Sequence, residues 1–196
     1  MDAERFDGRF FERFYYARRT RVAAPLDYLP RARLLAAYAS LFQIKVRRVL
    51  DAGAGAGFFL RALEAAFPVA RCTGIEVSNY ACARYAWTKS SITDYVARTP
   101  FDVVVCHDVL QYLDREAAVR ALSNLATLSK GLLYFTVLTR EDWRTNCDQA
   151  RTDGKVHLRS ANWYRQHLRR GFLRLGTGVY LARGVAPALF ALDQAP

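Results

Sequence analysis

Two stretches of the chain are almost uninterrupted runs of apolar residues, and they limit the folds open to it. Residues 101–109 read FDVVVCHDV and residues 131–138 read GLLYFTVL. A strand with two apolar faces must be covered on both of them, which is typical of parallel sheets that lie between helices. Residues 114–129 separate the two runs and have apolar side chains at helical spacing. This strand–helix–strand pattern predicts an α/β fold with a mainly parallel sheet.

The same alternation extends along the chain in both directions. We expect further strands at 47–52 and 71–77, and further helices at 57–67, 79–87 and 160–170. No internal repeat interrupts the 196 residues, so we expect a single domain.

The two ends of the chain have different patterns. FLRLGTGVYLAR, residues 172–183, predicts two strands joined at Gly176-Thr177-Gly178. Such a hairpin adds an antiparallel edge to the sheet. Residues 1–46 have the pattern of amphipathic helices, and residues 185–196 form a short tail.

The formal net charge of +11 is unevenly distributed along the chain. Residues 49–138 are balanced, whereas residues 1–48 and 139–196 hold the basic excess. Such an excess attracts nucleic acid or an anionic small molecule. No apolar run is long enough to span a bilayer, and the charged start MDAERFDGRF is unlike a secretory signal. We therefore expect a soluble, cytoplasmic protein without a membrane partner.

A glycine-rich loop, VLDAGAGAG at residues 49–57, follows the first expected strand. Glycine lets a backbone approach a ligand, because it tolerates positive φ and has no side chain to clash. The dinucleotide fingerprint G-x-G-x-x-G would place its third glycine where this chain has Phe58. Asp51 suits a nearby cation, and the following helix start suits an anion. Together they fit an amino-acid-bearing nucleoside better than a pyrophosphate.

Glu76 supplies the second half of this pattern. It lies in GIEVS at the end of the next expected strand, about 20 residues after Gly53. A carboxylate at that point accepts hydrogen bonds from both ribose hydroxyls of a bound nucleoside. The combination with the glycine loop predicts a nucleoside-cofactor site at the carboxyl edge of the sheet.

DAGAGAG, GIEVS and FDVVVCHDVLQYL, in this order, resemble the class I, Rossmann-like S-adenosylmethionine-dependent methyltransferases. The resemblance implies a seven-stranded, mostly parallel Rossmann-like sheet with helices on both faces and a C-terminal antiparallel hairpin. It also implies the cofactor S-adenosylmethionine and the product S-adenosylhomocysteine. Residues 1–196 then form one methyltransferase domain, with a helical cap at 1–46, a core at 47–184, an insertion at 139–158 and a tail at 185–196.

The resemblance also implies the residues that hold the cofactor. From the methionine part to the adenine they are Asp51, Ala52, Gly53, Gly55, Glu76, Val77, Ser91 and Ile92. Ser91 stands where the family more commonly has an aspartate. Cys106 and His107, after the strand that begins at Phe101, would lie beside the sulfonium and its methyl group.

Three residues close to the expected methyl group are candidates for catalysis: His107, Asp108 and Tyr112. Methyl transfer needs a base only when the acceptor arrives protonated. Each candidate also has a structural alternative. These are a hydrogen-bonded histidine at a strand end, a helix N-cap and a tyrosine packed on the sheet, respectively. The sequence leaves these alternatives open.

Residues 139–158 are too long for a simple connection and leave the sheet at its ligand-binding edge. We expect this segment and about the first 25 residues, which include FFERFYYARRTR, to cover the site and to select the acceptor through Tyr16, Trp143 and His157. Four basic side chains of the segment suit an acidic acceptor: Arg140, Arg144, Arg151 and Lys155. The alternative for Trp143 is that it only anchors the segment.

The sequence thus predicts methyl transfer from S-adenosylmethionine to an oxygen or nitrogen of a small-molecule acceptor, which can be acidic. CHDV stands where the DNA N-methylating members of the family have Asn/Asp-Pro-Pro-Tyr. A nicotinamide oxidoreductase is disfavoured by Phe58 and Asp51. Two alternatives stay open: an RNA or tRNA methyltransferase that uses the basic flanks, and a non-catalytic cofactor-binding partner subunit. The oligomeric state is also open.

A metal site is not expected. Cys106, His107, Cys147 and His157 have no spacing typical of zinc ligands. The four cysteines of the chain are interpreted as reduced, mostly buried thiols.

Overall fold

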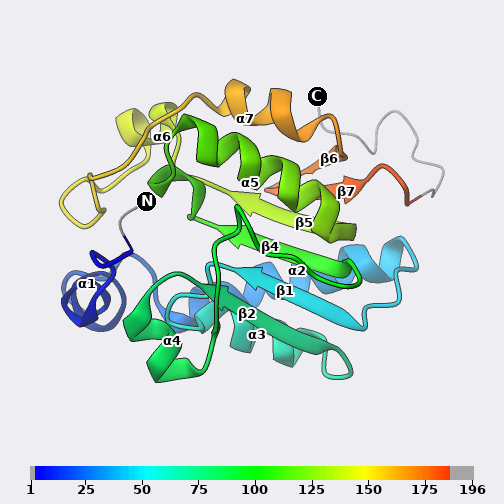
Figure 1. Ribbon diagram of the computed structural model, residues 1–196, viewed down its shortest axis with the longest axis horizontal. Helices are drawn as coiled ribbons and strands as arrows, with labels where there is room; N and C mark the ends of the chain where they lie inside the picture. Colours follow the sequence, from blue (N-terminus) through cyan, green and yellow to red (C-terminus); the bar gives the residue numbers. More distant parts are fainter. Residues whose placement is uncertain (1–2, 186–196) are drawn as a thin grey trace.

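A seven-stranded sheet forms the centre of the computed structural model, which describes residues 3–185 (Figure 1). The strands are β1 (Arg48–Ala52), β2 (Arg71–Glu76), β3 (Thr88–Lys89), β4 (Phe101–His107), β5 (Ser129–Thr136), β6 (Phe172–Gly176) and β7 (Val179–Ala182). They lie in the order β3-β2-β1-β4-β5-β7-β6. β7 runs antiparallel to β5 and β6, and the other neighbours are parallel. The predicted fold class is confirmed.

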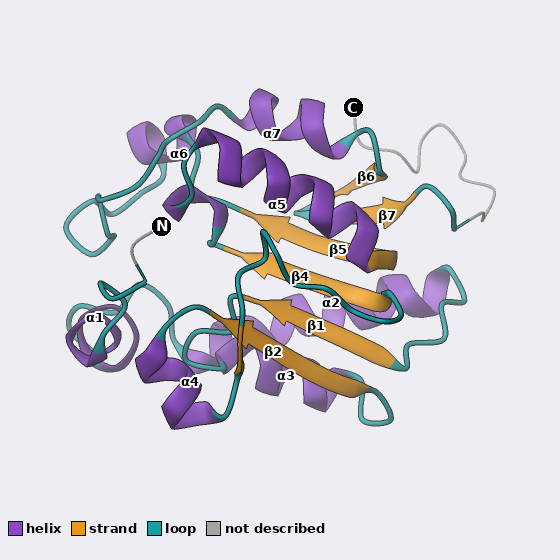
Figure 2. Ribbon diagram, viewed as in Figure 1, coloured by secondary structure: helices purple, strands orange, loops and turns teal. Residues whose placement is uncertain are grey.

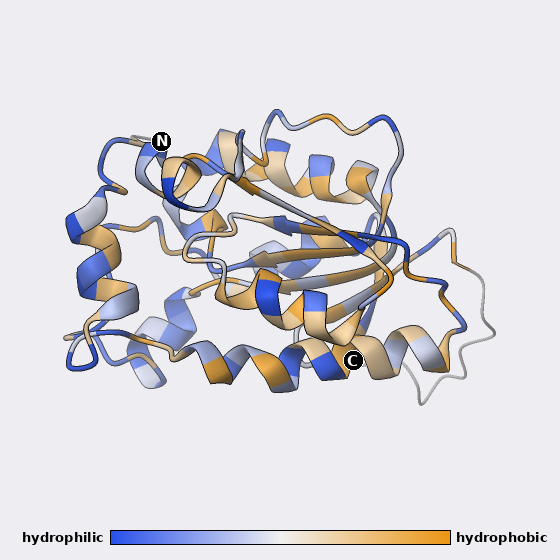
Figure 3. Ribbon diagram, turned by 90° about the horizontal axis from the view of Figure 1, so that it is seen from below, coloured by the Kyte–Doolittle hydropathy of each residue, from blue (hydrophilic) through white to orange (hydrophobic). Residues whose placement is uncertain are grey.

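Helices cover both faces of the sheet (Figures 2 and 3). α2 (Leu29–Leu41) and α3 (Phe58–Ala66) pack on one face, and α5 (Arg115–Leu128) and α7 (Ala161–Leu168) pack on the other. α4 (Asn79–Tyr85) connects β2 to β3. The helices expected from sequence are therefore present, each within a few residues of its expected ends.

Successive residues of the central strands point to opposite faces, which divides the core in two. Leu50 and Val104 pack with α5 and α7, whereas Val49, Val103 and Val105 pack with α2 and α3. All five side chains are fully buried. A strand with a helical layer on each face needs apolar residues at every position, which explains the uninterrupted apolar runs.

Two features of the sheet differ from the sequence prediction. β3 was not among the expected strands, because a strand of two residues is too short to show a periodic pattern. β4 includes Cys106 and His107, which were expected to follow the strand. Asp108 has a φ of +55°, which turns the chain out of the extended conformation.

The N-terminal cap contains several short helical pieces. α1 (Gly8–Phe11) continues into a π-helical turn, η1 (Glu12–Tyr16), and a 3₁₀ turn, η2 (Pro25–Tyr28), precedes α2. The hydroxyl of Ser78, before α4, donates a hydrogen bond to the carbonyl of Phe6 (2.5 Å). The start of the cap is thereby fixed to the carboxyl edge of the sheet, toward which the parallel strands point in Figure 1.

The segment after β5 lies at the same edge as the cap (Figure 1). It contains α6 (Arg140–Thr145) and a long irregular stretch. The guanidinium of Arg5 forms an ion pair with Asp153 (2.5 Å), and Arg151 donates to the carbonyl of Arg19 (2.9 Å). These contacts connect two segments that are far apart in the sequence.

Within residues 3–185, no helix combines the length and the apolar character that crossing a bilayer requires. The tail predicted at 185–196 falls, except for Val185, outside the described residues.

Candidate active site

The glycine loop after β1 has a backbone conformation that side chains rarely adopt. Gly53, Gly55 and Gly57 have φ angles of +86°, +50° and +72°. A Cβ atom on Gly53 would lie 2.4 Å from Cγ2 of Val109. Glycine at position 53 therefore lets the loop pass directly beside the turn that follows β4.

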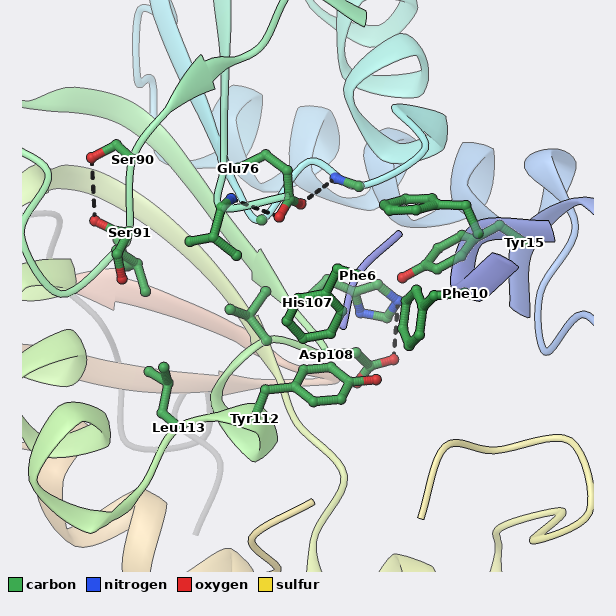
Figure 4. Close-up of a pocket in the computed structure, with 16 residues that line it drawn as sticks. Phe6, Phe10, Tyr15, Glu76, Ser90, Ser91, His107, Asp108, Tyr112 and Leu113 are labelled. Carbon is green, nitrogen blue, oxygen red and sulfur yellow. Dashed lines mark hydrogen bonds and ion pairs between the residues drawn. The ribbon is translucent and has the colours of Figure 1, made fainter. Parts of the chain in front are cut away.

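Glu76 ends β2, and backbone N–H groups hold its carboxylate beside the glycine loop. Gly55 donates to Oε2 (2.9 Å), whereas Val77 and Ser78 donate to Oε1 (2.7 and 3.1 Å). Hydrogen bonds to an ionised acceptor are the stronger kind, so they fix the position of this side chain. Figure 4 shows the Glu76 carboxylate with dashed hydrogen bonds to backbone nitrogens on two sides.

Asp51 lies in β1 and is only 2% exposed. Its Oδ2 atom has no hydrogen-bond partner among the described residues. Burial raises the pKa of the Asp51 carboxyl to about 7; the charge of Glu76 adds to the rise and a backbone hydrogen bond from Leu60 opposes it. A buried oxygen without a partner leaves a polar group unsatisfied, so a cation bound there would gain a strong interaction.

A pocket of about 610 Å³, here called the inner pocket, opens beside these groups (Figure 4). The predicted cofactor residues that line it are Gly53, Gly55, Glu76, Val77, Ser91, Ile92 and His107. A smaller pocket of about 310 Å³, here called the loop pocket, lies along the glycine loop and also reaches His107. Asp51, Ala52 and Cys106 line neither pocket. Ala52 and Cys106 are fully buried in the core between the sheet and α5, and Asp51 is buried in β1.

Three loops, which follow β2, β3 and β4, contribute an apolar wall to the inner pocket. Val77, Ile92 and Leu113 contribute this wall. The hydroxyl of Ser91 is engaged locally, since it accepts from the backbone N–H of Thr93 (3.2 Å) and bonds to the Thr93 hydroxyl (2.7 Å). Such a wall suits a flat ring with apolar faces.

Aromatic side chains of the N-terminal cap complete the inner pocket. Phe6, Phe10, Phe11 and Tyr15 line it together with Tyr112 (Figure 4). The rings of Phe6 and Tyr112 meet edge to face at 5.1 Å between centroids. None of these four cap residues was predicted individually. Phe10, Phe11 and Tyr15 lie in the aromatic run FFERFYYARRTR, and Phe6 precedes it.

Tyr16, predicted to contact the acceptor, lies elsewhere. Its hydroxyl forms a hydrogen bond with that of Tyr85 on α4 (2.7 Å), and Tyr16 lines neither the inner pocket nor the loop pocket. Tyr15 faces the site instead. The π-helical turn explains the difference, because its extra residue per turn changes which neighbouring side chain faces inward.

His107 ends β4 at the point where the pockets meet. Its Nδ1 forms a hydrogen bond with Oγ1 of Thr136 on β5, and its Nε2 lies 3.5 Å from Oδ2 of Asp108. The rings of Tyr28 and Phe59 pack edge-on against the imidazole, with centroids 5.6 and 5.7 Å away. The two ring nitrogens therefore have different partners, and the ring is fixed in orientation.

Asp108 does not cap a helix, which was its structural alternative. The helical turn Leu110–Tyr112 begins without a side-chain cap. The backbone N–H of Asp108 donates to the carbonyl of Thr136 (3.0 Å), and its side chain is 52% exposed. The carboxylate is directed toward His107 (Figure 4).

A larger cavity of about 1640 Å³, here called the outer pocket, adjoins the inner pocket. Phe10, Tyr15, His107, Asp108 and Tyr112 line both. Further lining comes from the cap, from α2 and from the segment after β5. Both segments that were expected to cover the site therefore border this cavity.

Trp143 and His157, the other two predicted acceptor contacts, line none of the three pockets. The Trp143 ring packs over Gly154 within its own segment, since a Cβ atom there would lie 3.3 Å from the ring. The backbone N–H of His157 donates to the carbonyl of Gln111 (2.7 Å). In the structure both residues anchor the segment, which was the alternative for Trp143.

Carboxylates outnumber cations in the lining of the outer pocket. The acidic residues are Asp108, Asp142, Asp148 and Asp153, and the basic ones are Arg31 and Arg151. Of the four basic residues expected to attract an acidic acceptor, only Arg151 lines the cavity. The lining therefore does not support the expectation of an acidic acceptor.

In the described part of the chain, no group of three or more His, Cys, Asp or Glu side chains is arranged to hold a metal ion. Burial raises the pKa of the Cys106 thiol, and the Cys147 thiol donates to the hydroxyl of Thr152 (3.1 Å).

Replacing Asp51 by Asn is expected to remove part of the pH dependence of stability. Because the folded-state pKa lies near 7 and the ordinary value is 3.8, the native state binds the proton more tightly. The free energy of unfolding should therefore fall between pH 4 and 7, by on the order of 3 kcal/mol from this group. Thermal unfolding at pH 5 and pH 8 measures this loss. Asp51→Asn should lose less unfolding free energy between pH 5 and pH 8 than the wild type. Glu64→Gln, on the exposed side of α3, should lose as much as the wild type. Equal losses in all three proteins would contradict the raised pKa of Asp51.

Comparison with known proteins agrees with the fold. The sequence pattern of a methyltransferase domain family matches residues 16–183. No curated protein sequence matches the chain. The N-methyltransferase NodS from Bradyrhizobium japonicum WM9 is similar in structure, with 21% identity, a TM-score of 0.55 and coverage of 80% of this chain and 94% of that one.

Two further structures are similar. For the plantazolicin methyltransferase BpumL, in complex with a pentazolic desmethylPZN analog and S-adenosylhomocysteine (SAH), the identity is 17%, the TM-score 0.62 and the coverage 76% of this chain and 64% of that one. For DesVI from Streptomyces venezuelae, the identity is 16%, the TM-score 0.58 and the coverage 80% of this chain and 91% of that one. The strand order and the glycine loop agree with the family match over residues 16–183. The chain therefore belongs to the methyltransferase domain family, as an S-adenosylmethionine-dependent enzyme of the class I type.

Proposed function

We propose that the protein transfers the methyl group of S-adenosylmethionine to a nitrogen or oxygen of a small molecule held in the outer pocket. One observation carries this proposal: the inner and outer pockets meet at His107 and Asp108, which line both. A cofactor in one pocket and an acceptor in the other would then meet beside these two side chains. Holding two reactants in contact is the main requirement of an in-line displacement.

The inner and loop pockets fit the cofactor. The unpartnered Oδ2 of Asp51 suits its ammonium group, and the loop pocket along Gly53 and Gly55 suits the rest of its methionine part. Glu76 would accept from the ribose hydroxyls, and the wall that contains Ile92 would pack on the adenine. When bound, the cofactor supplies a methyl carbon activated by a sulfonium.

His107 is the proposed base for an acceptor that arrives protonated. If Nδ1–H donates to the hydroxyl oxygen of Thr136, the lone pair of Nε2 stays free to accept a proton. The Asp108 carboxylate, 3.5 Å away, would stabilise the resulting imidazolium. Tyr112 has another role in this proposal, because burial raises the pKa of its hydroxyl and keeps it a neutral hydrogen-bond donor.

The solved structures of similar fold support small acceptors in general. NodS is named an N-methyltransferase, and BpumL was crystallised with analogues of a desmethyl compound. The lining of the outer pocket gives independent support, since its four carboxylates would repel the phosphates of an RNA backbone.

Asp51→Asn should weaken the binding of S-adenosylhomocysteine by about 10- to 100-fold at pH 8, because the ammonium loses a charged partner. Isothermal titration calorimetry measures this affinity. Glu64→Gln serves as the control for loss of a distant carboxylate, and NAD serves as a ligand that should not bind. An affinity of Asp51→Asn within twofold of the wild type would rule out the proposed ammonium contact.

His107→Gln should lower turnover about 10²- to 10⁴-fold, the usual contribution of a general base. Its affinity for S-adenosylhomocysteine should stay within threefold of the wild type. The assay offers methyl-labelled S-adenosylmethionine and three matched acceptors, phenethylamine, phenethyl alcohol and phenylacetate, and detects methylated products by mass spectrometry. Wild-type turnover with none of the three would contradict the proposed function, and unchanged turnover of His107→Gln would contradict its role as base.

A further inference from the structure

The outer pocket has a wall of aromatic rings beside its junction with the inner pocket. Phe10, Phe14, Tyr15, Tyr28 and Tyr112 all line it. The rings of Phe10 and Phe14 lie 4.9 Å apart, and those of Phe10 and Tyr112 lie 6.4 Å apart. The faces of such rings attract organic cations, above all where water is partly excluded.

Asp108 is the carboxylate of this cavity that also lines the inner pocket, where the methyl group would be held. Asp153 is paired with Arg5 at 2.5 Å, and Asp142 accepts from the backbone N–H of Thr139 as part of the α6 cap. Asp148 lies 3.8 Å from Arg151. Asp108 contacts His107 at 3.5 Å, and half of its side chain is exposed.

The two lining cations are already engaged with the protein. Arg31 donates to the carbonyl of Asp27, and Arg151 donates to the carbonyl of Arg19 (2.9 Å) in addition to its contact with Asp148. The negative charge of Asp108 also adds to the effect of burial in raising the pKa of the Tyr15, Tyr28 and Tyr112 hydroxyls. The junction therefore combines neutral aromatic hydroxyls with one open negative charge.

Gln111 provides a second, independent observation. Its side chain is 5% exposed and lines the outer pocket, and its Oε1 atom has no hydrogen-bond partner within residues 3–185. Its backbone carbonyl accepts from the N–H of His157, which fixes the residue in place. A buried amide oxygen that accepts no hydrogen bond costs free energy. A ligand that donates a hydrogen bond to it would therefore be favoured.

The backbone at Asp108 is also unusual. A φ of +55° is uncommon for a residue other than glycine, and it is stabilised here by the hydrogen bond from the Asp108 N–H to Thr136. In this conformation the carboxylate is directed toward His107 (Figure 4), and the two residues line both pockets.

From these features we infer that the acceptor is an amine, recognised as its ammonium ion by Asp108, Gln111 and the aromatic wall. The inference rests on the proposed function and names its acceptor class. An ammonium ion would give the Asp108 carboxylate a positively charged partner. It would also donate an N–H to the unpartnered Oε1 of Gln111. A carboxylate would be repelled by Asp108, and a hydroxyl would satisfy only one hydrogen bond.

The reaction with an amine balances as follows. The ammonium ion gives one proton to Nε2 of His107, which leaves a neutral nitrogen with a lone pair. That lone pair forms the bond to the methyl carbon, and the carbon–sulfur bond breaks with its electron pair remaining on sulfur. The product is a methylammonium ion, S-adenosylhomocysteine and a proton that passes from His107 to solvent.

Binding of three matched probes tests the inference without turnover. The full chain, saturated with S-adenosylhomocysteine, is titrated calorimetrically with phenethylamine, phenethyl alcohol and phenylacetate at pH 7.5, a condition chosen so that the amine is charged. We expect the amine to bind at least tenfold more tightly than the alcohol, and phenylacetate to bind most weakly. Asp108→Asn should reduce the preference for the amine over the alcohol to threefold or less. Gln111→Leu should weaken the amine more than the alcohol, and Glu64→Gln should keep the full preference.

Each other outcome overturns the inference. Equal binding of amine and alcohol by the wild type, tighter binding of phenylacetate, or no binding of any probe all contradict it, and so does a full amine preference in Asp108→Asn. Wild-type results alone decide the matter if a variant does not fold. The turnover assay distinguishes failure of this inference from failure of the proposed function. Methylation of the alcohol or of phenylacetate without a preference for the amine overturns only the amine inference. No methylated product from any acceptor overturns the proposed function.

Discussion

Two buried carboxylates, Asp51 and Glu76, lie near each other at the carboxyl edge of the sheet, and the rest of the site is arranged around them. Glu76 is held by three backbone N–H groups, so its position follows from the glycine loop and the start of α4. Asp51 lacks such support on Oδ2, and burial together with the Glu76 charge raises its pKa to about 7. Without a bound cation this arrangement costs free energy. A cofactor that carries an ammonium group would offset that cost when it binds.

Much of the fold was predictable because its signals are local or periodic. The apolar runs at β4 and β5 indicated strands covered on both faces, and Asp114 and Ser78 act as the N-caps that helices require. The glycine loop and Glu76 were also recognisable, since their spacing is fixed by the strand–loop–helix geometry. The two-residue β3 was not, and neither was the extension of β4 to His107. Both depend on single backbone conformations that no pattern in the sequence encodes.

The acceptor side was predicted less well, for physical reasons. The choice between Tyr15 and Tyr16 depends on a π-helical turn, whose extra residue shifts the inward face. Trp143 and His157 lie in an irregular segment without a period, so their anchoring roles depend on tertiary contacts with Gly154 and Gln111. The net charge of +11 was also a poor guide, because the cavity that borders the cap gathers four of the acidic residues. Global charge describes how a protein attracts partners at long range, whereas local carboxylates decide what a pocket accepts.

The most direct test of this account is a crystal structure of the complex with S-adenosylhomocysteine. The account predicts that the amino group of the ligand lies within hydrogen-bond distance of Oδ2 of Asp51, directly or through one water, and that its ribose hydroxyls bond to Glu76. The sulfur should lie beside His107, facing the outer pocket. A ligand bound away from the glycine loop, or one that leaves Oδ2 of Asp51 without a partner, would contradict the central claim.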